Sequence, residues 1–202
     1  MPDADSATIL VVCTGNICRS PYLEFALRDA LAEVGADDVA VHSAGTRAVV
    51  GSPIADEMGE LLAGDGIDAG SFRARQLTRD LIEGADLVLT ADRGHRKDVL
   101  QLDPRALNRT FTIRQFARLV PIAAGLPDPR HRADGSARDR LDRLIERCSA
   151  ARAHTPPVGG DDDVADPWGL TQDDYERAAG QLGPAARVVA DALRARAARP
   201  QP

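Results

Sequence analysis

The sequence predicts an α/β fold in three layers, in which a parallel sheet lies between helices on both of its faces. Short apolar runs typical of buried strands alternate along the chain with segments of helical periodicity. Strands separated by helices run parallel, and the connections between them are right-handed crossovers. Four strands are expected, over residues 8–12, 39–42, 86–90 and 109–113.

The first expected strand and the first expected helix lie on either side of a short loop. Residues 8–12 are apolar and β-branched, as in a strand that is buried on both faces. A row of leucines predicts a helix over residues 21–34. Pro21 suits its first position and Ser20 the cap before it, while Gly35 should end it.

The other helices are predicted from apolar periodicity and from residues that start or stop a helix. Asp92 could cap one of them, and the Gly-Asp-Gly turn at 64–66 closes another. The final helix could be kinked where Gly183 precedes Pro184. These helices are expected over residues 53–63, 78–83, 93–101, 114–119, 136–153 and 171–198.

The stretch from residue 121 to residue 160 differs in composition from the rest of the chain. It contains Pro/Asp/Gly turn signals and ends in a Pro/Gly linker. The helix within it is highly charged and carries Cys148 on its apolar stripe, so Cys148 is expected in the core. The acidic run at 161–163 that follows is most simply read as solvated.

Composition and charge argue against several functions. The formal net charge is −6, so a general nucleic-acid binder is not expected. No apolar run approaches the length of a membrane-spanning helix, which argues against membrane insertion. Residues 1–5 lack the features of a signal peptide, and a cytoplasmic protein is therefore expected.

The cysteines point to chemistry and not to a disulfide framework. Cys13, Cys18 and Cys148 are few and odd in number in a chain without an export signal. The four histidines show no metal-ligand spacing, so neither a metal nor another cofactor is expected.

The segment Cys-Thr-Gly-Asn-Ile-Cys-Arg-Ser-Pro, residues 13–21, is the most informative part of the sequence. It joins the first strand to the first helix, and ligands of open α/β sheets bind beyond the carboxyl ends of the strands. A loop that enters a helix directs backbone N–H groups at one point, where the helix dipole also favours an anion. The same field favours a thiolate, so Cys13 is a candidate nucleophile.

Other side chains of this segment suit the binding of a tetrahedral anion. Arg19 follows Cys13 by six residues, and its planar fork can hold two phosphate oxygens at once. Gly15 permits close approach of the backbone, and Asn16 tolerates left-handed geometry. The hydroxyl of Ser20 could hydrogen-bond the sulfur of Cys13. The alternative, a buried cysteine before an ordinary turn, does not account for this combination.

The segment resembles the Cys-x-Gly-Asn-x-Cys-Arg-Ser signature of the bacterial low-molecular-weight protein-tyrosine phosphatases. The similarity covers most of the chain and continues at residues 43–46, 66–68, 74–77, 86–89 and 166–168. It implies a flavodoxin-like, four-stranded parallel sheet in a single domain over residues 1–202. Since residues 121–160 exceed the length of a typical member, they are expected to be an insertion.

The resemblance implies hydrolysis of phosphotyrosine through a phosphocysteine intermediate, with a general acid in an Asp-Pro-aromatic motif. Asp-Pro pairs occur at Asp103, Asp128 and Asp166. Asp166 is expected to be the acid because only this pair is followed by an aromatic residue, Trp168, which could form a wall of the pocket. Asp163 is a less favoured substitute.

The resemblance also assigns supporting roles. Ser43 should help Asn16 hold the loop, whereas Phe72 stands where the family often has a histidine, and Arg75 is either structural or part of a surface salt bridge. Cys18 is either a small buried residue or, as the resemblance favours, a partner that traps oxidised Cys13. Residues expected to bind phosphate or substrate are Thr14, Gly15, Asn16, Ile17, Cys18, Ser20 and Trp168.

Other functions of proteins with a similar loop fit the sequence less well or stay open. An arsenate reductase needs further cysteines, and residues 90–100 contain none. A phosphocarrier or a non-catalytic phosphate-binding module needs neither Arg19 nor Asp166. A protein-arginine phosphatase or a small-molecule phosphatase stays open, although relatives that act on phosphoarginine carry a threonine at the position of Ile17. The expected partner is a phosphotyrosine protein, for which a bacterial tyrosine kinase is one candidate.

Overall fold

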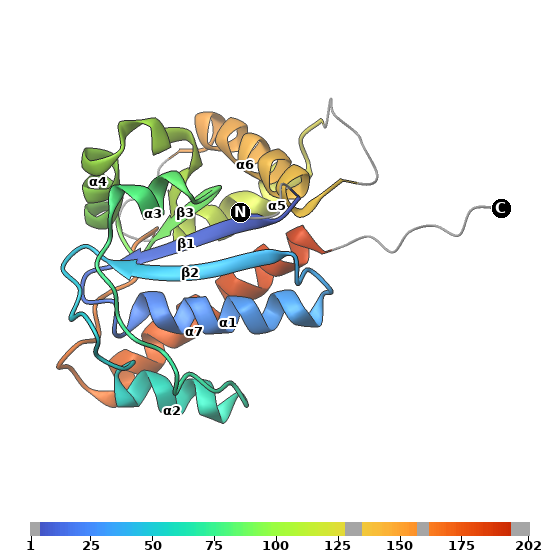
Figure 1. Cartoon of the computed structure of the whole chain (residues 1–202). Coiled ribbons are helices and arrows are strands. Elements are labelled where there is room, and N and C mark those ends of the chain that lie inside the picture. The colour runs from blue at the N-terminus through green and yellow to red at the C-terminus, as the bar shows by residue number, and fades with distance from the viewer. Residues whose placement is uncertain (1–4, 128–134, 157–161, 195–202) are drawn as a thin grey trace.

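The computed structural model describes residues 5–127, 135–156 and 162–194. Strands and helices alternate through most of this part of the chain (Figure 1). In chain order the elements are β1 (Ala7–Cys13), α1 (Arg19–Glu33), β2 (Val39–Gly45), α2 (Asp56–Gly64), α3 (Arg79–Glu83), β3 (Leu87–Thr90), α4 (Arg93–Leu102), the 3-10 helix η1 (Pro104–Arg109), β4 (Thr110–Thr112), α5 (Ile113–Ala124), α6 (Ala137–His154) and α7 (Gln172–Leu193).

The four strands form one parallel sheet in the order β2-β1-β3-β4. The register pairs Cys13 with Gly45 and Val12 with Thr90, and Thr90 in turn with Thr112. The carboxyl ends of all four strands therefore meet at one edge of the sheet. The predicted four-stranded parallel sheet is confirmed, and its strand order places the loops after β1 and β3 side by side.

Two apolar cores lie on the two faces of the sheet. Ile9 and Val11 of β1 belong to the larger core, which α1, α2, α5, α6 and α7 complete. Leu10 and Val12 belong to the smaller core, which α3, α4 and η1 cover. Because β1 is buried on both faces, its sequence is apolar without alternation. The expected helices on both faces of the sheet are thus present.

The start of α1 differs from the prediction. The helix begins at Arg19, so Pro21 is its third residue and Ser20 its second, and Ser20 is not the cap. The capping residue is Cys18, whose side chain makes no capping hydrogen bond. The loop winds directly into the helix, which leaves the first N–H groups of α1 free of side-chain caps. This is the arrangement that an anion-binding helix start needs.

The region from residue 121 onwards is more helical than predicted. Helix α5 continues through Pro121 to Ala124, whereas the prediction ended it at residue 119. In α6 the expected apolar stripe is buried in the larger core, with Cys148 fully inaccessible, which confirms the core position of that cysteine. Helix α7 runs as one element through Pro184 to Leu193, and the prediction for residues 195–198 lies outside the described residues.

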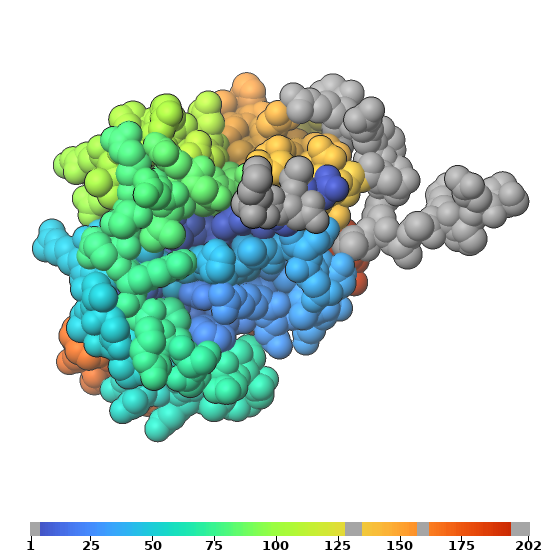
Figure 2. All heavy atoms as spheres, viewed as in Figure 1, coloured from blue at the N-terminus to red at the C-terminus, as the bar shows by residue number. Residues whose placement is uncertain are grey.

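The segment between α2 and α3 covers the exposed edge of the sheet. Figures 1 and 2 show this green segment on the surface beside the end of β2. Leu77 donates its N–H to the carbonyl of Gly45, and Gly51 donates to the carbonyl of Ala74. These backbone contacts tie the segment to the end of the sheet at which the strands terminate.

Candidate active site

The loop from Cys13 to Ser20 joins β1 to α1 at the carboxyl end of the sheet. The Sγ atom of Cys13 lies 2.9 Å from the Oγ atom of Ser20, which is the contact expected from the sequence. Asn16 has a φ of 55°, the left-handed conformation that its residue type tolerates. Both Cys13 and Asn16 are buried, so the loop is held from inside the protein.

A buried set of hydrogen bonds, here called the inner network, fixes the shape of the loop. The Nδ2 atom of Asn16 donates to Ser20 Oγ at 2.9 Å and to Ser43 Oγ at 2.8 Å. Its Oδ1 atom accepts from the backbone N–H of Arg75 at 2.9 Å. Ser43 Oγ in turn donates to Glu24 Oε2 at 2.5 Å. The supporting role expected for Ser43 therefore has its geometric basis, and Glu24 joins it as a residue that the sequence analysis missed.

Glu24 and Arg75 both contact Ser43, through its hydroxyl and its carbonyl respectively. Burial raises the pKa of the Glu24 carboxyl above its usual value, while the hydrogen bond from Ser43 and the charge of Arg28 act in the opposite direction. Arg75 Nε donates to the carbonyl of Ser43 at 2.7 Å, which favours the structural interpretation of this arginine. Phe72 instead packs its ring edge-on against Phe25, with the centroids 6.1 Å apart.

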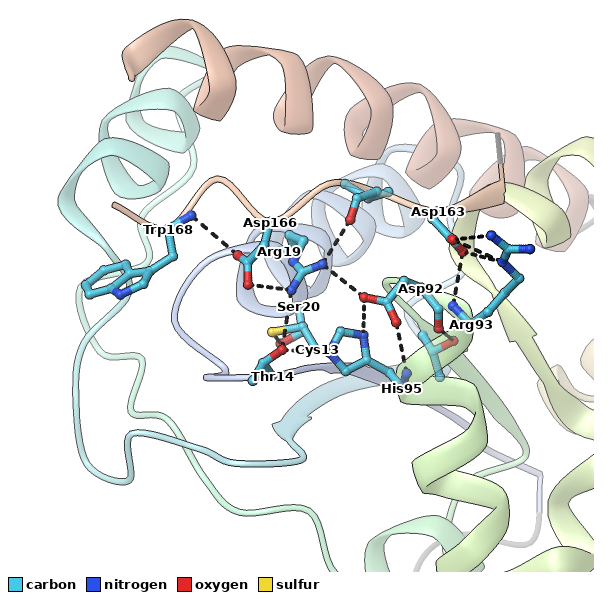
Figure 3. A network of polar contacts seen from close by, with 12 residues as sticks. Cys13, Thr14, Arg19, Ser20, Asp92, Arg93, His95, Asp163, Asp166 and Trp168 are labelled. Atoms are coloured by element: carbon cyan, nitrogen blue, oxygen red, sulfur yellow. Dashed lines mark hydrogen bonds and ion pairs between the residues drawn. The ribbon is translucent and has the colours of Figure 1, made fainter. Parts of the chain in front are cut away.

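A second set of contacts, here called the outer network, holds the side chain of Arg19 (Figure 3). Arg19 Nη1 donates to Asp92 Oδ2 at 3.3 Å and to the carbonyl of Val164 at 2.9 Å. His95 places Nδ1 2.9 Å from the same Asp92 oxygen, although its N–H direction lies off the line between the two atoms. Its Nε2 atom lies 2.8 Å from Thr14 Oγ1. The outer network thus consists of Arg19, Asp92, His95 and Thr14.

Asp92 is an anion in this network. Burial disfavours its charge, but the nearby side chain of His95, the hydrogen bond from the backbone N–H of His95 and the positive charge of Arg19 outweigh that effect. The pKa of Asp92 is therefore well below its usual range. Asp92 was predicted as a helix cap, and the 2.9 Å contact of its carboxylate with the N–H of His95 confirms this. Neither Asp92 nor His95 was predicted to belong to the site.

One edge of the Arg19 guanidinium faces away from these partners. The Nε atom is buried and has no acceptor among the described residues. A buried donor without an acceptor is costly, and an anion held in the loop would supply the missing acceptor. This edge is the feature of the site that most directly indicates phosphate binding.

Among the candidate acids within the described residues, Asp166 is the one that lies beside Arg19. Its Oδ2 atom lies 2.8 Å from Arg19 Nη2, and its side chain is 48% exposed (Figure 3). Asp163 instead pairs with Arg93, where its Oδ2 atom lies 2.9 Å from Nη2. Asp103 is buried against arginines near η1, and Asp128 lies outside the described residues.

Backbone and side-chain contacts hold the segment that carries Asp166. The N–H of Val164 donates to the carbonyl of Ala91 at 2.9 Å, directly after β3. Asp162 is buried and pairs with Arg118. The interpretation of the acidic run as merely solvated was therefore wrong for Asp162 and Asp163, because both carboxylates meet arginines from other elements. Asp161 lies outside the described residues.

Cys18 is buried beside the nucleophile candidate and is present as a free thiol. Burial, together with the charges of Cys13 and Asp166, raises its pKa to about 12. Cys18 is therefore protonated at neutral pH, and its role in trapping oxidised Cys13 stays a prediction.

Apolar side chains surround the mouth of the loop. Val49 is 50% exposed, and its N–H donates to the carbonyl of Gly15 at 3.0 Å. Trp168 is 60% exposed and follows Asp166 closely in the chain; its ring is directed away from Arg19 (Figure 3). Ile17 is buried within the loop itself. Of these three residues, here called the rim, Val49 and Trp168 present exposed apolar surface, and Ile17 adds a buried apolar side chain.

The described residues contain neither a metal-ligand cluster nor a membrane-spanning helix. Within residues 5–127, 135–156 and 162–194, no group of three or more His, Cys, Asp or Glu side chains is arranged to hold a metal ion. In the same part of the chain, no helix combines the length and the apolar character required to span a membrane.

The sequence is similar to those of known proteins. The family model described as low molecular weight phosphotyrosine protein phosphatase matches residues 8–155, which include the loop but not Asp166. A probable low molecular weight protein-tyrosine-phosphatase of Ralstonia nicotianae, EpsP, is 40% identical over 106 residues, 52% of this chain and 70% of the relative. A protein-arginine-phosphatase of Geobacillus stearothermophilus is 36% identical over 143 residues, 69% of this chain and 91% of the relative.

The fold is shared with solved structures. The crystal structure of the low molecular weight protein tyrosine phosphatase from T. tengcongensis superposes with a TM-score of 0.66 at 28% identity, covering 92% of this chain and 99% of that one.

Proposed function

Because the chain belongs to the low molecular weight phosphotyrosine protein phosphatase family, we propose that Cys13 is its nucleophile, Arg19 its phosphate clamp and Asp166 its general acid. The observation that carries this assignment is the convergence of three groups at one point. The Cys13 sulfur, the unpaired Nε of Arg19 and the exposed carboxyl of Asp166 surround the start of α1.

In the first step the thiolate of Cys13 attacks the phosphorus atom. A sulfur–phosphorus bond forms while the bond from phosphorus to the ester oxygen breaks, and the proton of the Asp166 carboxyl goes to that oxygen. The N–H groups of the loop and the fork of Arg19 hold the remaining phosphate oxygens. Ser20 Oγ, 2.9 Å from the sulfur, can donate to it and stabilise the thiolate before attack.

In the second step water hydrolyses the phosphocysteine. Asp166, now a carboxylate, accepts a proton from the water while the water oxygen bonds to phosphorus. The sulfur–phosphorus bond breaks at the same time. The thiolate of Cys13 is regenerated and inorganic phosphate leaves. Since Asp166 is half exposed, water can reach its carboxylate.

The mechanism is tested by trapping the intermediate. Acid-quenched reactions with p-nitrophenyl phosphate should yield a peptide with one phosphate on Cys13, and Cys13→Ser should abolish turnover. Cys148→Ser is the matched control, because that thiol is buried in α6, and it should leave the kinetics unchanged. Turnover that persists in Cys13→Ser, or phosphate found on another residue, would refute the assignment.

The substrate we propose is phosphotyrosine in a protein. The rim presents apolar surface to an aromatic ring, whereas a guanidinium group would leave its N–H donors unpaired beside Ile17. Phosphoserine is too short to reach from the rim into the loop. The 36% identical protein-arginine-phosphatase supports phosphoarginine as the second candidate.

Matched phosphopeptides distinguish the two substrates. The wild type should show a higher kcat/KM for phosphotyrosine than for phosphoarginine or phosphoserine. Ile17→Thr should shift the ratio towards phosphoarginine, while Ile17→Val, which has the same branched shape without the hydroxyl, should not. A wild-type preference for phosphoarginine would reverse the specificity and leave the phosphatase mechanism intact.

The remaining parts of the proposal concern partners, location and domain organisation. We propose a phosphotyrosine protein, with a bacterial tyrosine kinase as the candidate, as the substrate of a cytoplasmic enzyme. The three cysteines are free thiols, in keeping with a reducing compartment. We further propose one domain with an insertion at about residues 121–160, supported by the burial of α6 in the larger core.

A further inference from the structure

The side chain of His95 links the phosphate loop to the carboxylate that holds the clamp arginine. It is buried, and it reaches Thr14 Oγ1 through Nε2 and Asp92 Oδ2 through Nδ1. Resting on the function proposed above, we propose that His95 is a positioning residue of the phosphate site, which orients Arg19 through Asp92 and Thr14.

The four side chains of the outer network form a closed ring (Figure 3). Arg19 touches it twice, since Nη1 donates to Asp92 at 3.3 Å and Nη2 donates to Thr14 Oγ1 at 3.5 Å. His95 bridges the other two members at 2.8 Å and 2.9 Å. The two longer contacts of the ring are made by Arg19, and the two shorter ones are made by His95. The imidazole therefore lies closer to Asp92 and Thr14 than the guanidinium does.

The donors and acceptors around the ring agree with one arrangement of protons. An Asp92 carboxylate beside Nδ1 favours a proton on that nitrogen. In neutral His95 the Nε2 atom is then an acceptor, and Thr14 donates its hydroxyl proton to it. The lone pairs of Thr14 Oγ1 are left for Arg19 Nη2, whose N–H points at them. Each link therefore orients the next.

The ring acts on the part of Arg19 that does not bind phosphate. With Nη1 directed at Asp92 and Val164, the plane of the guanidinium is fixed, while Nε, which has no acceptor among the described residues, stays free to bind an anion. Without His95, Asp92 loses one of the partners that keep its carboxylate in place, and Thr14 is free to rotate. The clamp then has to be ordered during each catalytic cycle, which lowers transition-state stabilisation.

Capping of α4 does not explain this side chain. Asp92 caps the helix through its Oδ1 atom and the backbone N–H of His95, a contact that any residue at position 95 could provide. The imidazole uses the other oxygen of Asp92 and a residue of the phosphate loop. Replacing the imidazole should therefore alter catalysis more than it alters the helix.

Two conservative variants test the two ends of the bridge separately. The amide of His95→Gln can reach Thr14 but not Asp92, and the amide of His95→Asn can reach Asp92 but not Thr14. With p-nitrophenyl phosphate, each should lower kcat by about tenfold or more, up to about 10²-fold for His95→Leu, which removes both contacts. Inhibition by orthovanadate should weaken in parallel, because the anion needs the same clamp.

Val99→Ala is the matched control on the same helix. Val99 is buried in the smaller core and its apolar side chain offers no hydrogen bond to the ring, so this variant should lower the melting temperature and leave kcat and the vanadate inhibition constant unchanged. If the His95 variants resemble Val99→Ala, with lower stability and wild-type kinetics, the positioning role is refuted. If the wild type does not hydrolyse aryl phosphates at all, the proposed function fails instead.

Two further measurements do not depend on the stability of the His95 variants. Nitrogen-15 NMR of the wild-type protein should find a proton on Nδ1 of His95, and a bare Nδ1 would overturn the ring. Thr14→Val, which keeps the shape of the side chain, should reduce the effect of a subsequent His95→Asn change on kcat, because that change removes the contact of His95 with Thr14. Strictly independent effects of the two changes would show that the hydroxyl and the imidazole do not act together.

Discussion

The inner and outer networks hold the same loop, but they differ in what they fix. The inner network, Asn16, Ser20, Ser43, Glu24 and Arg75, binds the backbone and keeps Asn16 in its left-handed conformation. The outer network binds the guanidinium of Arg19 and includes the half-buried residues Thr14 and Asp92. One network determines the shape of the anion site, and the other determines where its positive charge lies.

Their acidic residues show the difference most clearly. Burial raises the pKa of Glu24, whose best-placed partner is a hydroxyl. Asp92 has its pKa held well below the usual range, because His95 and Arg19 outweigh the effect of burial. A carboxyl that supports a backbone can tolerate protonation, whereas one that orients an arginine has to stay charged.

The largest effect is expected at Arg19, the residue that the outer network holds. Arg19→Lys keeps the charge but loses the fork that reaches Asp92, Val164 and the anion together, so turnover should fall by about 10³-fold or more. The control is Arg140→Lys, because Arg140 of α6 forms an ion pair with Asp38. This change should leave turnover unchanged. Steady-state kinetics with p-nitrophenyl phosphate measure both, and a fall below tenfold for Arg19→Lys would contradict the clamp.

The next largest effect is expected at Asp166, whose carboxyl contacts Arg19 but does not belong to the outer network. Asp166→Asn should slow phenyl phosphate by about 10²–10⁴-fold and p-nitrophenyl phosphate much less, since only the poorer leaving group needs a proton. Asp163→Asn removes the ion pair with Arg93 and should have little effect on either substrate. Equal losses for the two substrates would exclude Asp166 as the acid.

A smaller pair of effects separates shape from charge. Ser43→Ala removes one hydrogen bond each from the buried side chains of Asn16 and Glu24, so the free energy of unfolding should fall by about 1–3 kcal/mol. Thr14→Val should cost less than about 1 kcal/mol, because Thr14 is half buried, and should lower kcat instead. Urea unfolding and initial rates would reveal the contrast, and a larger stability loss for Thr14→Val would reverse the roles of the networks.

The smallest effects are the opposite pH dependences of the two acids. The folded-state pKa of Glu24 is raised above 4.5, so its contribution to stability is full below that pH and is lost as the pH rises through the raised value. The folded-state pKa of Asp92 lies below 3.8, so its contribution is present above that pH and is lost as the pH falls through the lowered value.

Two variants that cannot titrate measure these contributions. Relative to Glu24→Gln, the wild type should lose stability as the pH rises from 4 to 7. Relative to Asp92→Asn, it should gain stability as the pH rises from 2 to 4. Urea unfolding across this pH range provides the comparison. Slopes of the same sign for both acids would show that the two networks do not differ electrostatically.

Sequence patterns were sufficient to predict the sheet, the phosphate loop and several local features. The strands, the left-handed Asn16, the cap at Asp92 and the core position of Cys148 were predicted correctly, because each depends on the residue itself or on neighbours within a few positions. Ser20 was misplaced as a cap because the loop winds into α1 two residues earlier than Pro21 indicates.

The side chains that support the loop could be identified only from contacts between residues far apart in the chain. Ser43 and Glu24 are 19 residues apart, Thr14 and His95 are 81 apart, and Val164 reaches Arg19 across 145 residues. A carboxylate or an imidazole in the sequence carries no mark of such a partner. The order β2-β1-β3 brings the ends of three strands together at Cys13, and that arrangement turns Glu24, Asp92 and His95 into parts of one site. Periodicity reports which face of an element is buried, whereas partners across a sheet depend on how the elements pack.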